Sequence, residues 1–196
     1  NQQTKIDFLT ANTDIAPTIL RLADVVVPDS IDGKDMLNLR FPNSIPNHNF
    51  VPLINVWGSA PAQALSIVTK RWKYIYWFYG EGMSPSEELY DLSNDINEMH
   101  NVAHDMKHKP ALEKLRALYD LQVEKWQTDA LDNNGYQAYS VLLDRKIHWD
   151  NKRALMENQY QQAYYRLLTP YQGESDYFEK EYGLSMPNTK VTISQK

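Results

Sequence analysis

The sequence predicts an α+β fold in which a small antiparallel sheet packs on an amphipathic helix and a helical C-terminal extension follows. Three observations lead to this prediction. An aromatic-rich stretch with strand periodicity spans residues 64–79, a shorter strand pattern spans residues 87–92, and an apolar repeat of three to four residues begins at Pro110. Because residues 64–79 have the pattern of a hairpin, the sheet is expected to be antiparallel.

The first expected element is a helix in the stretch DIAPTILRLADVVVP, residues 14–28. Thr13 or Asp14 can cap it, and Pro17 falls in the first turn, where its missing N–H is harmless. Pro28 is expected to end it, and residues 29–33 are rich in turn formers. Residues 38–52 contain three prolines and four asparagines, which predicts an irregular connection.

Residues 64–79 give the clearest strand signal. ALSIVT alternates along the chain, and WKYIYWFY is rich in aromatic and β-branched residues. Lys70 and Arg71 lie between the two halves and are expected to form a two-residue turn. Both faces of the second half are largely apolar, which predicts a central strand covered on both sides. EELYDL is expected to be a third, short strand.

Two helices are expected after the strands. The helix that begins at Pro110 is strongly amphipathic, with apolar residues on one face: Leu112, Leu115, Leu118, Tyr119, Val123 and Trp126. Residues 136–168 predict a second long helix with a less regular apolar face. From Thr169 the chain is turn-rich and polar, which predicts a loose tail.

The composition excludes several classes of function. The chain has 196 residues and a net charge of −5, so binding to nucleic acid or to an anionic membrane is not expected. Its apolar runs are far shorter than the roughly 20 residues of a membrane span. It contains no cysteine, which excludes disulfides, thiolate metal sites and a cysteine nucleophile.

The chain begins at Asn1 without a signal peptide, and we expect it to be a piece of a longer protein.

A cluster of polar side chains follows the third strand, at Asp91, Asp95, Glu98, His100 and Asn101. Several oxygen ligands at short spacing suit a hard cation, but this spacing differs from an EF-hand. The favoured interpretation is structural. Asp95 and Glu98 fit a capping box, in which each side chain accepts from the other's backbone N–H.

The histidines offer a second candidate for metal binding. His100, His104 and His108 follow an i, i+4 spacing that could bind zinc on a helix. The glutamate of H-E-x-x-H is absent, and the surrounding residues predict a solvated loop. We therefore expect no metal site and no catalytic residue in this chain.

Aromatic and basic side chains around the hairpin could contact a ligand. Trp57 lies in the loop that enters the hairpin, where ligand contacts concentrate, although packing is the simpler explanation. Lys70 and Arg71, with Lys73, could bind an anion such as sulfate. The simpler explanation for three surface cations at a turn is that they are solvated.

Three motifs in order resemble the C-terminal portion of type I sulfatases, a family of the alkaline phosphatase-like superfamily. TDIAPTILRLADVVVPDSIDGKDML resembles the stretch that closes their large α/β domain, and ALSIVTKRWKYIYWFYG resembles the strand pair of their C-terminal subdomain. EELYDLSNDINEMHNVA resembles the next strand and turn, although Ile96 replaces the usual proline. The resemblance covers residues 14–126, and residues 135–196 extend past it.

The resemblance implies a division of the chain and a role for each part. Residues 1–40 would be the end of the sulfatase α/β domain, residues 41–132 the C-terminal subdomain, and residues 133–196 a helical extension with a loose tail. In this family the active site lies upstream, where a formylglycine made from cysteine or serine attacks sulfur with the help of calcium. The motif of the nucleophile, cysteine or serine-x-proline-x-arginine, is absent from this chain.

The resemblance also implies a function, partners and a location. The whole protein would hydrolyse sulfate esters, on a carbohydrate, in the periplasm, outside the cell or in the lysosome. This chain would supply scaffold and one wall of the substrate cleft, with His48, Trp57, Lys70 and Arg71 as substrate-binding candidates. It would pack against the upstream α/β domain of the same protein and would be inactive alone.

Two alternatives remain open at this stage. The chain could belong to a related phosphodiesterase or phosphatase of the same superfamily, whose folds look alike. It could also be a glycan-binding or subunit-interaction module, with residues 136–168 as the interface of a homo-oligomer.

Overall fold

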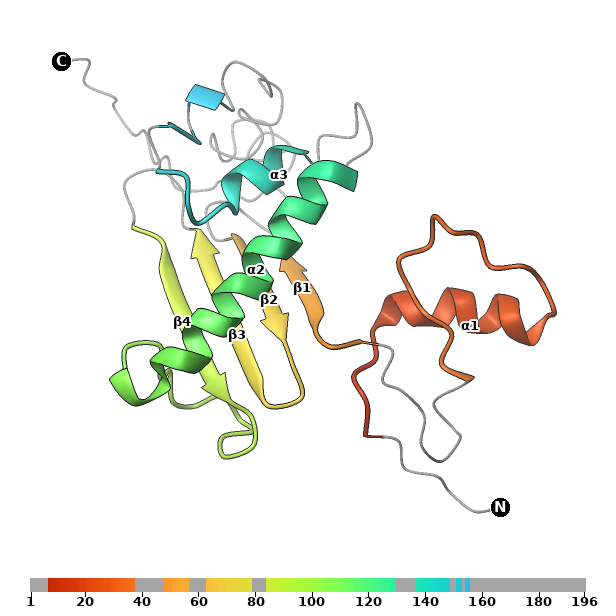
Figure 1. Cartoon of the computed structure of the whole chain (residues 1–196), viewed down its shortest axis with the longest axis horizontal. Coiled ribbons are helices and arrows are strands. Elements are labelled where there is room, and N and C mark those ends of the chain that lie inside the picture. The colour runs from red at the N-terminus through yellow and green to blue at the C-terminus, as the bar shows by residue number, and fades with distance from the viewer. Residues whose placement is uncertain are drawn as a thin grey trace, which may run out of the picture.

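A four-stranded antiparallel sheet with the strand order β1-β2-β3-β4 forms the centre of the molecule (Figure 1). The strands are β1 (Val51–Asn55), β2 (Gln63–Val68), β3 (Trp72–Phe78) and β4 (Ser86–Asp91). The computed structural model describes residues 7–37, 48–56, 63–78, 84–129, 137–148, 151–152 and 154–155. The α+β prediction is confirmed, because this sheet is packed on helices.

The hairpin of β2 and β3 has the predicted turn. Val68 pairs with Lys73 in the ladder, and the Thr69 N–H donates to the Trp72 carbonyl at 2.8 Å, which leaves Lys70 and Arg71 as the two loop residues. β3 is an inner strand of the sheet, as its two apolar faces predict, and β2 is the other inner strand. On the face turned away from the helices, Ile75 of β3 is only 7% exposed.

β1 is a strand that the sequence did not predict, because its residues were assigned partly to an irregular connection. Pro52 lies within it, opposite Ile67 of β2. Since proline has no N–H to donate, it is tolerated on an edge strand, and β1 is an edge of this sheet.

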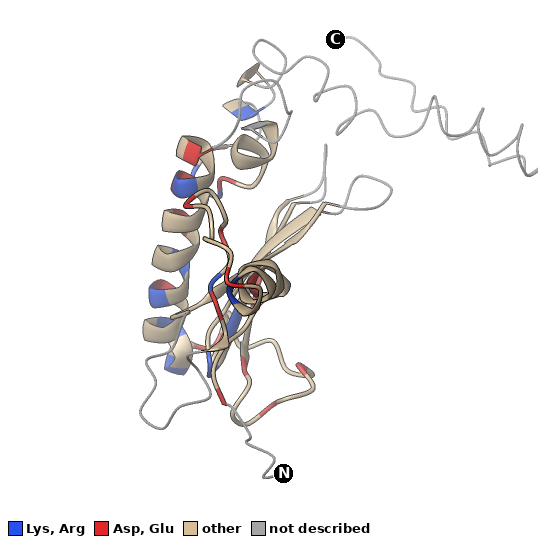
Figure 2. Ribbon diagram, turned by 90° about the vertical axis from the view of Figure 1, so that its right-hand side faces the viewer, with Lys and Arg blue, Asp and Glu red and all other residues tan. Residues whose placement is uncertain are grey.

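The helix α2 (Lys109–Asp129) packs along one face of the sheet (Figure 1), and Pro110 lies in its first turn as predicted. Leu112, Leu115, Tyr119 and Val123 are buried in the hydrophobic core. The Tyr119 ring meets the rings of Tyr74 and Tyr76 edge to face, at centroid distances of 5.5 and 5.7 Å. Charged residues lie along the outer side of this helix (Figure 2).

The helix α1 (Ile15–Leu22) lies beside the sheet rather than over it (Figure 1) and is shorter than predicted. It ends six residues before Pro28 because Asp24 adopts a left-handed φ of 57°. The Val25 N–H then donates to the Leu20 carbonyl at 2.9 Å, as in a Schellman motif. Asp14 stands at the N-cap position, but its side chain makes no capping bond to α1.

The prediction of one long helix over residues 136–168 is wrong within the described residues. The helix α3 (Gln137–Leu142) has six residues, and the chain turns at residues 143–148. Asp144 explains the interruption, because its carboxylate accepts the Lys146 N–H at 2.8 Å in a local turn. The rest of the predicted helix, from residue 156, lies outside the described residues.

The helix α3 is part of the same core as the sheet and α2. Leu142 and Leu143 are fully buried in the hydrophobic cluster that contains Leu65, Tyr74 and Leu115. The Tyr119 hydroxyl donates to the Leu143 carbonyl at 2.5 Å. The extension is therefore joined to the core by both apolar and polar contacts.

The polar cluster after β4 stabilises the loop that follows this strand, but its hydrogen bonds differ from the predicted ones. The capping box is wrong: Asp95 accepts from the N–H groups of Met99 and His100, at 3.1 and 2.8 Å. Glu98 instead binds the Lys73 ammonium at 2.6 Å. Asn101 accepts the Leu89 N–H at 3.0 Å, which fastens the loop to β4.

In the part of the chain described, no helix is long and apolar enough to cross a bilayer.

Candidate functional site

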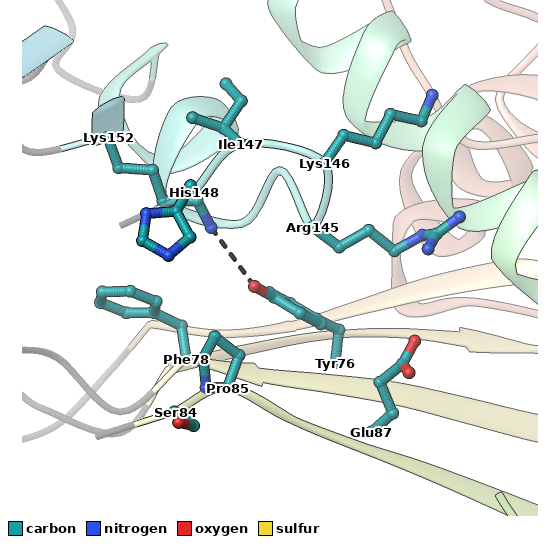
Figure 3. A pocket seen from close by; sticks show the side chains of 10 residues that line it. All are labelled: Tyr76, Phe78, Ser84, Pro85, Glu87, Arg145, Lys146, Ile147, His148 and Lys152. Carbon is teal, nitrogen blue, oxygen red and sulfur yellow. Dashed lines mark hydrogen bonds between the residues drawn. The ribbon is translucent and has the colours of Figure 1, made fainter. Parts of the chain in front are cut away.

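A cavity of about 550 Å³ lies at the end of the sheet where β3 ends and β4 begins. The sheet forms its floor, and the turn after α3 forms its roof (Figure 3). Ten residues line it: Tyr76, Phe78, Ser84, Pro85, Glu87, Arg145, Lys146, Ile147, His148 and Lys152. We refer to it below as the Lys152 cavity.

Lys152 is the most deeply buried charged residue of this cavity, with 1% of its surface exposed. Its ammonium donates to the Leu142 carbonyl at 2.7 Å and to the Tyr76 hydroxyl at 3.3 Å (Figure 3). It also lies 5.3 and 5.4 Å from the ring centroids of Phe78 and Tyr76, within reach of a cation–π interaction. Burial lowers the pKa of Lys152 to about 8, although the charge of Asp144 opposes the change.

Two further cations of the roof are held by one acid of α2. Asp120 accepts from Arg145 Nε and Nη2 at 2.7 and 2.9 Å, and it lies 3.2 Å from the Lys146 ammonium. A guanidinium bound in this bidentate way has a fixed orientation. The turn that roofs the cavity is therefore anchored to α2.

Glu87 is the acid on the floor of the cavity, and its charge is already paired. It binds Arg116 of α2 through both carboxylate oxygens and accepts from the Tyr74 hydroxyl at 2.5 Å. Burial would raise the pKa of Glu87, but Arg116 and Tyr74 outweigh it and lower the value. Burial, together with the charge of Glu87, raises the pKa of Tyr76 to about 12.

A second buried charge lies at the start of α1. Asp14 is fully buried and accepts the N–H groups of Ala11 and Lys34, both at 2.8 Å. The His48 Nε2 atom lies 2.9 Å from each of its carboxylate oxygens. Burial alone would raise the pKa of Asp14, but these donors lower it. His48, predicted to bind substrate, is thus held by a buried carboxylate, and 14% of its side chain is exposed.

Gly33 brings the Lys34 N–H to Asp14. A Cβ atom at position 33 would lie 1.9 Å from the Thr13 carbonyl oxygen, closer than any non-bonded contact. The loop therefore passes the start of α1 at a distance that only glycine permits. Thr18 makes a second link, since its hydroxyl accepts the Met36 N–H at 3.0 Å.

Lys70 and Arg71, the predicted anion-binding pair, lie together in the β2–β3 turn, but each has an acidic partner. Arg71 donates to both oxygens of Asp91, at 3.2 and 2.9 Å, and lowers the pKa of that carboxyl to about 2. Lys70 lies 2.7 Å from a carboxylate oxygen of Asp7. Their role as substrate contacts stays a prediction. Trp57 lies outside the described residues.

Two of the three histidines with i, i+4 spacing, His100 and His108, contact different residues. His100 has an 82% exposed side chain near Asp95, and the His108 ring packs on Trp72 at 5.4 Å. Among the described residues, no three His, Asp or Glu side chains are arranged to hold a metal ion.

Residues 1–125 match the family described as N-sulphoglucosamine sulphohydrolase, C-terminal. The chain belongs to this family. The resemblance to the C-terminal portion of sulfatases is therefore confirmed.

The curated relatives of this sulphohydrolase C-terminal domain are named as sulfatases. Arylsulfatase K of Xenopus laevis is 31% identical over 128 residues, which cover 59% of this chain and 23% of that protein. The delta 4,5-hexuronate-2-O-sulfatase of Bacteroides thetaiotaomicron is 30% identical over 121 residues, which cover 59% and 24%. This chain thus spans about a quarter of the length of these relatives.

A solved structure described as a 2-O GAG sulfatase aligns with 61% of this chain and 26% of its own. The identity is 28% and the TM-score is 0.49.

Only part of the Lys152 cavity lies within residues 1–125, which match the family. The lining residues of the floor lie within the sulphohydrolase domain: Tyr76, Phe78, Ser84, Pro85 and Glu87. Those of the roof lie beyond it: residues 145–148 and Lys152. Sequence analysis missed this site because Lys152 and Tyr76 are 76 positions apart and no spacing pattern joins them. Only the extra length of the chain pointed to a role for this region.

Proposed function

We propose that the whole protein hydrolyses sulfate esters on a carbohydrate and that this chain supplies scaffold and one wall of the substrate cleft. The family match over residues 1–125 carries the proposal, supported by relatives whose names describe sulfatases. His48, Trp57, Lys70 and Arg71 are the candidates for substrate contact.

The surface of α1 supports an upstream domain as the partner of this chain. Apolar side chains at i, i+4 and i+7 are exposed along it: Ile15 by 50%, Ile19 by 58% and Leu22 by 66%. Val26, just beyond the helix, is 86% exposed. Such a stripe on a helix normally packs against another element. We assign it to the α/β domain that carries the active site.

The formylglycine and calcium of sulfatases do not fit the residues of this chain. The sequence has no cysteine and no cysteine or serine-x-proline-x-arginine motif. The buried carboxylates of Asp14 and Asp91 are already engaged, Asp14 by N–H groups and His48, and Asp91 by Arg71. The half-buried Glu87 is bound by Arg116. Both groups therefore belong to the upstream domain in this proposal, as does a periplasmic, extracellular or lysosomal location.

The test is sulfate release from sulfated sugars and from an aryl sulfate, by the intact protein and by the 196-residue chain. The intact protein should release sulfate, and the chain alone should not. Preferential release of phosphate from matched phosphate esters would instead favour a phosphatase or phosphodiesterase. Hydrolysis by the chain alone would contradict the assignment of the active site to the upstream domain.

Substitutions of the candidate contacts test the cleft wall. His48→Gln, and Lys70→Met combined with Arg71→Met, should raise KM for a sulfated sugar with little change in kcat. Lys114→Met, an exposed lysine of α2, is the matched control. An unchanged KM in both variants would show that these residues do not contact the substrate.

The mass of the intact protein in solution tests the proposed homo-oligomer, since the mass of a monomer would exclude it.

A further inference from the structure

We infer that the Lys152 cavity binds a sugar unit that carries a sulfate or a carboxylate, with that anion facing Lys152. The choice of a sugar depends on the proposed function, whereas the choice of an anion depends on the cavity alone.

Among the described residues, no acid is in contact with the Lys152 ammonium. Its two acceptors in the described structure, the Tyr76 hydroxyl and the Leu142 carbonyl, are both neutral. A buried ammonium is unfavourable unless it is paired, and two of its three N–H groups account for these bonds. An anion in the cavity would supply the missing opposite charge.

The other charged groups around the cavity do not supply it. Glu87 is bound by Arg116 and Tyr74, and Asp120 is shared by Arg145 and Lys146. Asp144 acts on Lys152 through its charge, but its carboxylate accepts the Lys146 N–H. His148 also lines the cavity, so four of the ten lining residues are basic and one is acidic. Asp120 already pairs with Arg145 and Lys146, so it is the charge of Lys152 that favours an anion over a cation in this cavity.

The size and walls of the cavity suit a sugar rather than a bare ion. Its volume of about 550 Å³ falls in the range of roughly 300–1,000 Å³ typical of small-molecule sites. Phe78 and Pro85 provide apolar surface across from Lys152 and His148, and Ile147 adds an apolar side chain on the roof (Figure 3). A pyranose ring presents apolar C–H groups and polar substituents in the same way.

The extension supplies the decisive residue. Lys152 and the roof lie beyond residues 1–125, which match the sulphohydrolase family. The cavity is therefore completed by residues outside the matched domain, and it would let the protein hold an acidic sugar through a contact made by the extension.

Isothermal titration calorimetry of the intact protein tests the inference with four probes: N-acetylglucosamine 6-sulfate, glucuronate, N-acetylglucosamine and inorganic sulfate. We expect the two charged sugars to bind about tenfold or more tightly than the neutral sugar, because a buried charge-assisted contact is gained. At pH 8.5 their binding should also take up a proton, detected in buffers of different ionisation enthalpy, since an anion stabilises the Lys152 ammonium.

Lys152→Met keeps the side-chain volume and removes the charge, and Lys114→Met is the matched control. Lys152→Met should weaken the binding of charged sugars about tenfold and abolish the proton uptake, while Lys114→Met should change neither. Ile147→Trp provides a second variant that fills the cavity and should also abolish this binding. Hydrolysis of a small aryl sulfate by the wild type and by Lys114→Met is measured separately, so failure of the proposed function would be distinguished from failure of this inference.

Three results would overturn the inference. These are equal affinity of the neutral and charged sugars, unchanged binding and proton uptake in both Lys152→Met and Ile147→Trp, and binding of inorganic sulfate as tight as that of the charged sugars.

Discussion

Two regions of this molecule each contain a charged side chain that is almost completely buried. The two side chains differ in whether their hydrogen-bond partners stabilise the charge. Asp14, beside α1, accepts from two backbone N–H groups and from His48. Lys152, under the turn after α3, has only neutral acceptors in the described structure. The pKa of Asp14 is lowered, which favours its charged form, whereas burial lowers the pKa of Lys152 to about 8, which disfavours its charged form.

The difference teaches that burial of a charge does not by itself identify a functional group. The carboxylate of Asp14 is saturated with donors and holds the 7–37 segment together, so it is structural. The ammonium of Lys152 faces a cavity and contacts no acid among the described residues, so it is the better candidate for binding a ligand. Substitutions at the two sites should therefore have opposite effects.

The largest expected effect is at Asp14. Asp14→Ala would remove a buried carboxylate that accepts the N–H groups of Ala11 and Lys34, and should destabilise the 7–37 segment by about 3 kcal/mol. Lys152→Met should be neutral or stabilising, because it removes a buried charge. Native-state hydrogen exchange measures both, with exposed Asp29→Ala as the control. Equal destabilisation by the two substitutions would contradict the conclusion that Asp14 is structural and Lys152 is not.

Gly33→Ala should have the next largest effect. Its Cβ would overlap the Thr13 carbonyl oxygen, so the loop must move away from Asp14 at a cost of about 2 kcal/mol. Hydrogen exchange should accelerate at Lys34 and in the first turn of α1, and it should not change in β2 and β3. An effect that spreads to the sheet would show that the two regions are coupled.

The pH dependence of stability should distinguish the two charges. Because the pKa of Lys152 is about 8 in the folded chain and near 10.5 in the unfolded chain, the unfolded chain binds more protons between these values. The free energy of unfolding should therefore rise with pH across this window, on the order of 2 kcal/mol. The difference between wild type and Lys152→Met in urea titrations isolates this contribution from tyrosine ionisation.

Asp14 should act at the acid end instead. Its pKa is lowered in the folded chain, so its contribution is complete above pH 4 and is lost as the pH falls through the folded value. Opening of α1, followed by hydrogen exchange, should then rise only in strong acid. Opening that begins well above the usual range of an aspartate pKa would show that Asp14 is not the controlling group.

The smallest effect is expected from Thr18→Val. This change removes the acceptor of the Met36 N–H and the donor to the Asp14 carbonyl, and should cost about 1 kcal/mol in the 7–37 segment. A loss as large as that of Asp14→Ala, in the same exchange experiment, would mean that the carboxylate is not the main support of this segment.

The fold was predictable where local patterns decide structure. The aromatic strand, the turn at Lys70 and Arg71 and the helix after Pro110 follow from periodicity and turn chemistry. β1 was missed because Pro52 argues against a strand, and only its edge position makes the proline harmless. The helix after residue 136 was predicted too long because apolar periodicity continues past Asp144, whose side chain turns the chain.

The candidate sites were predictable only in part. His48 was singled out through a family resemblance, but its buried partner Asp14 was assigned to helix capping. Nothing in the sequence joins Lys152 to Tyr76, since their contact depends on how the extension folds back over the sheet. Contacts between distant positions of this kind require the tertiary structure.

The hydrogen bond from Tyr119 to the Leu143 carbonyl bears on how this protein can be divided for engineering. A truncation placed where the family match ends would leave a phenol hydroxyl in the core without its acceptor and would uncover apolar surface of α2. A swap between relatives should therefore transfer residues 109–155 as one block, with both ends of that bond in the same piece.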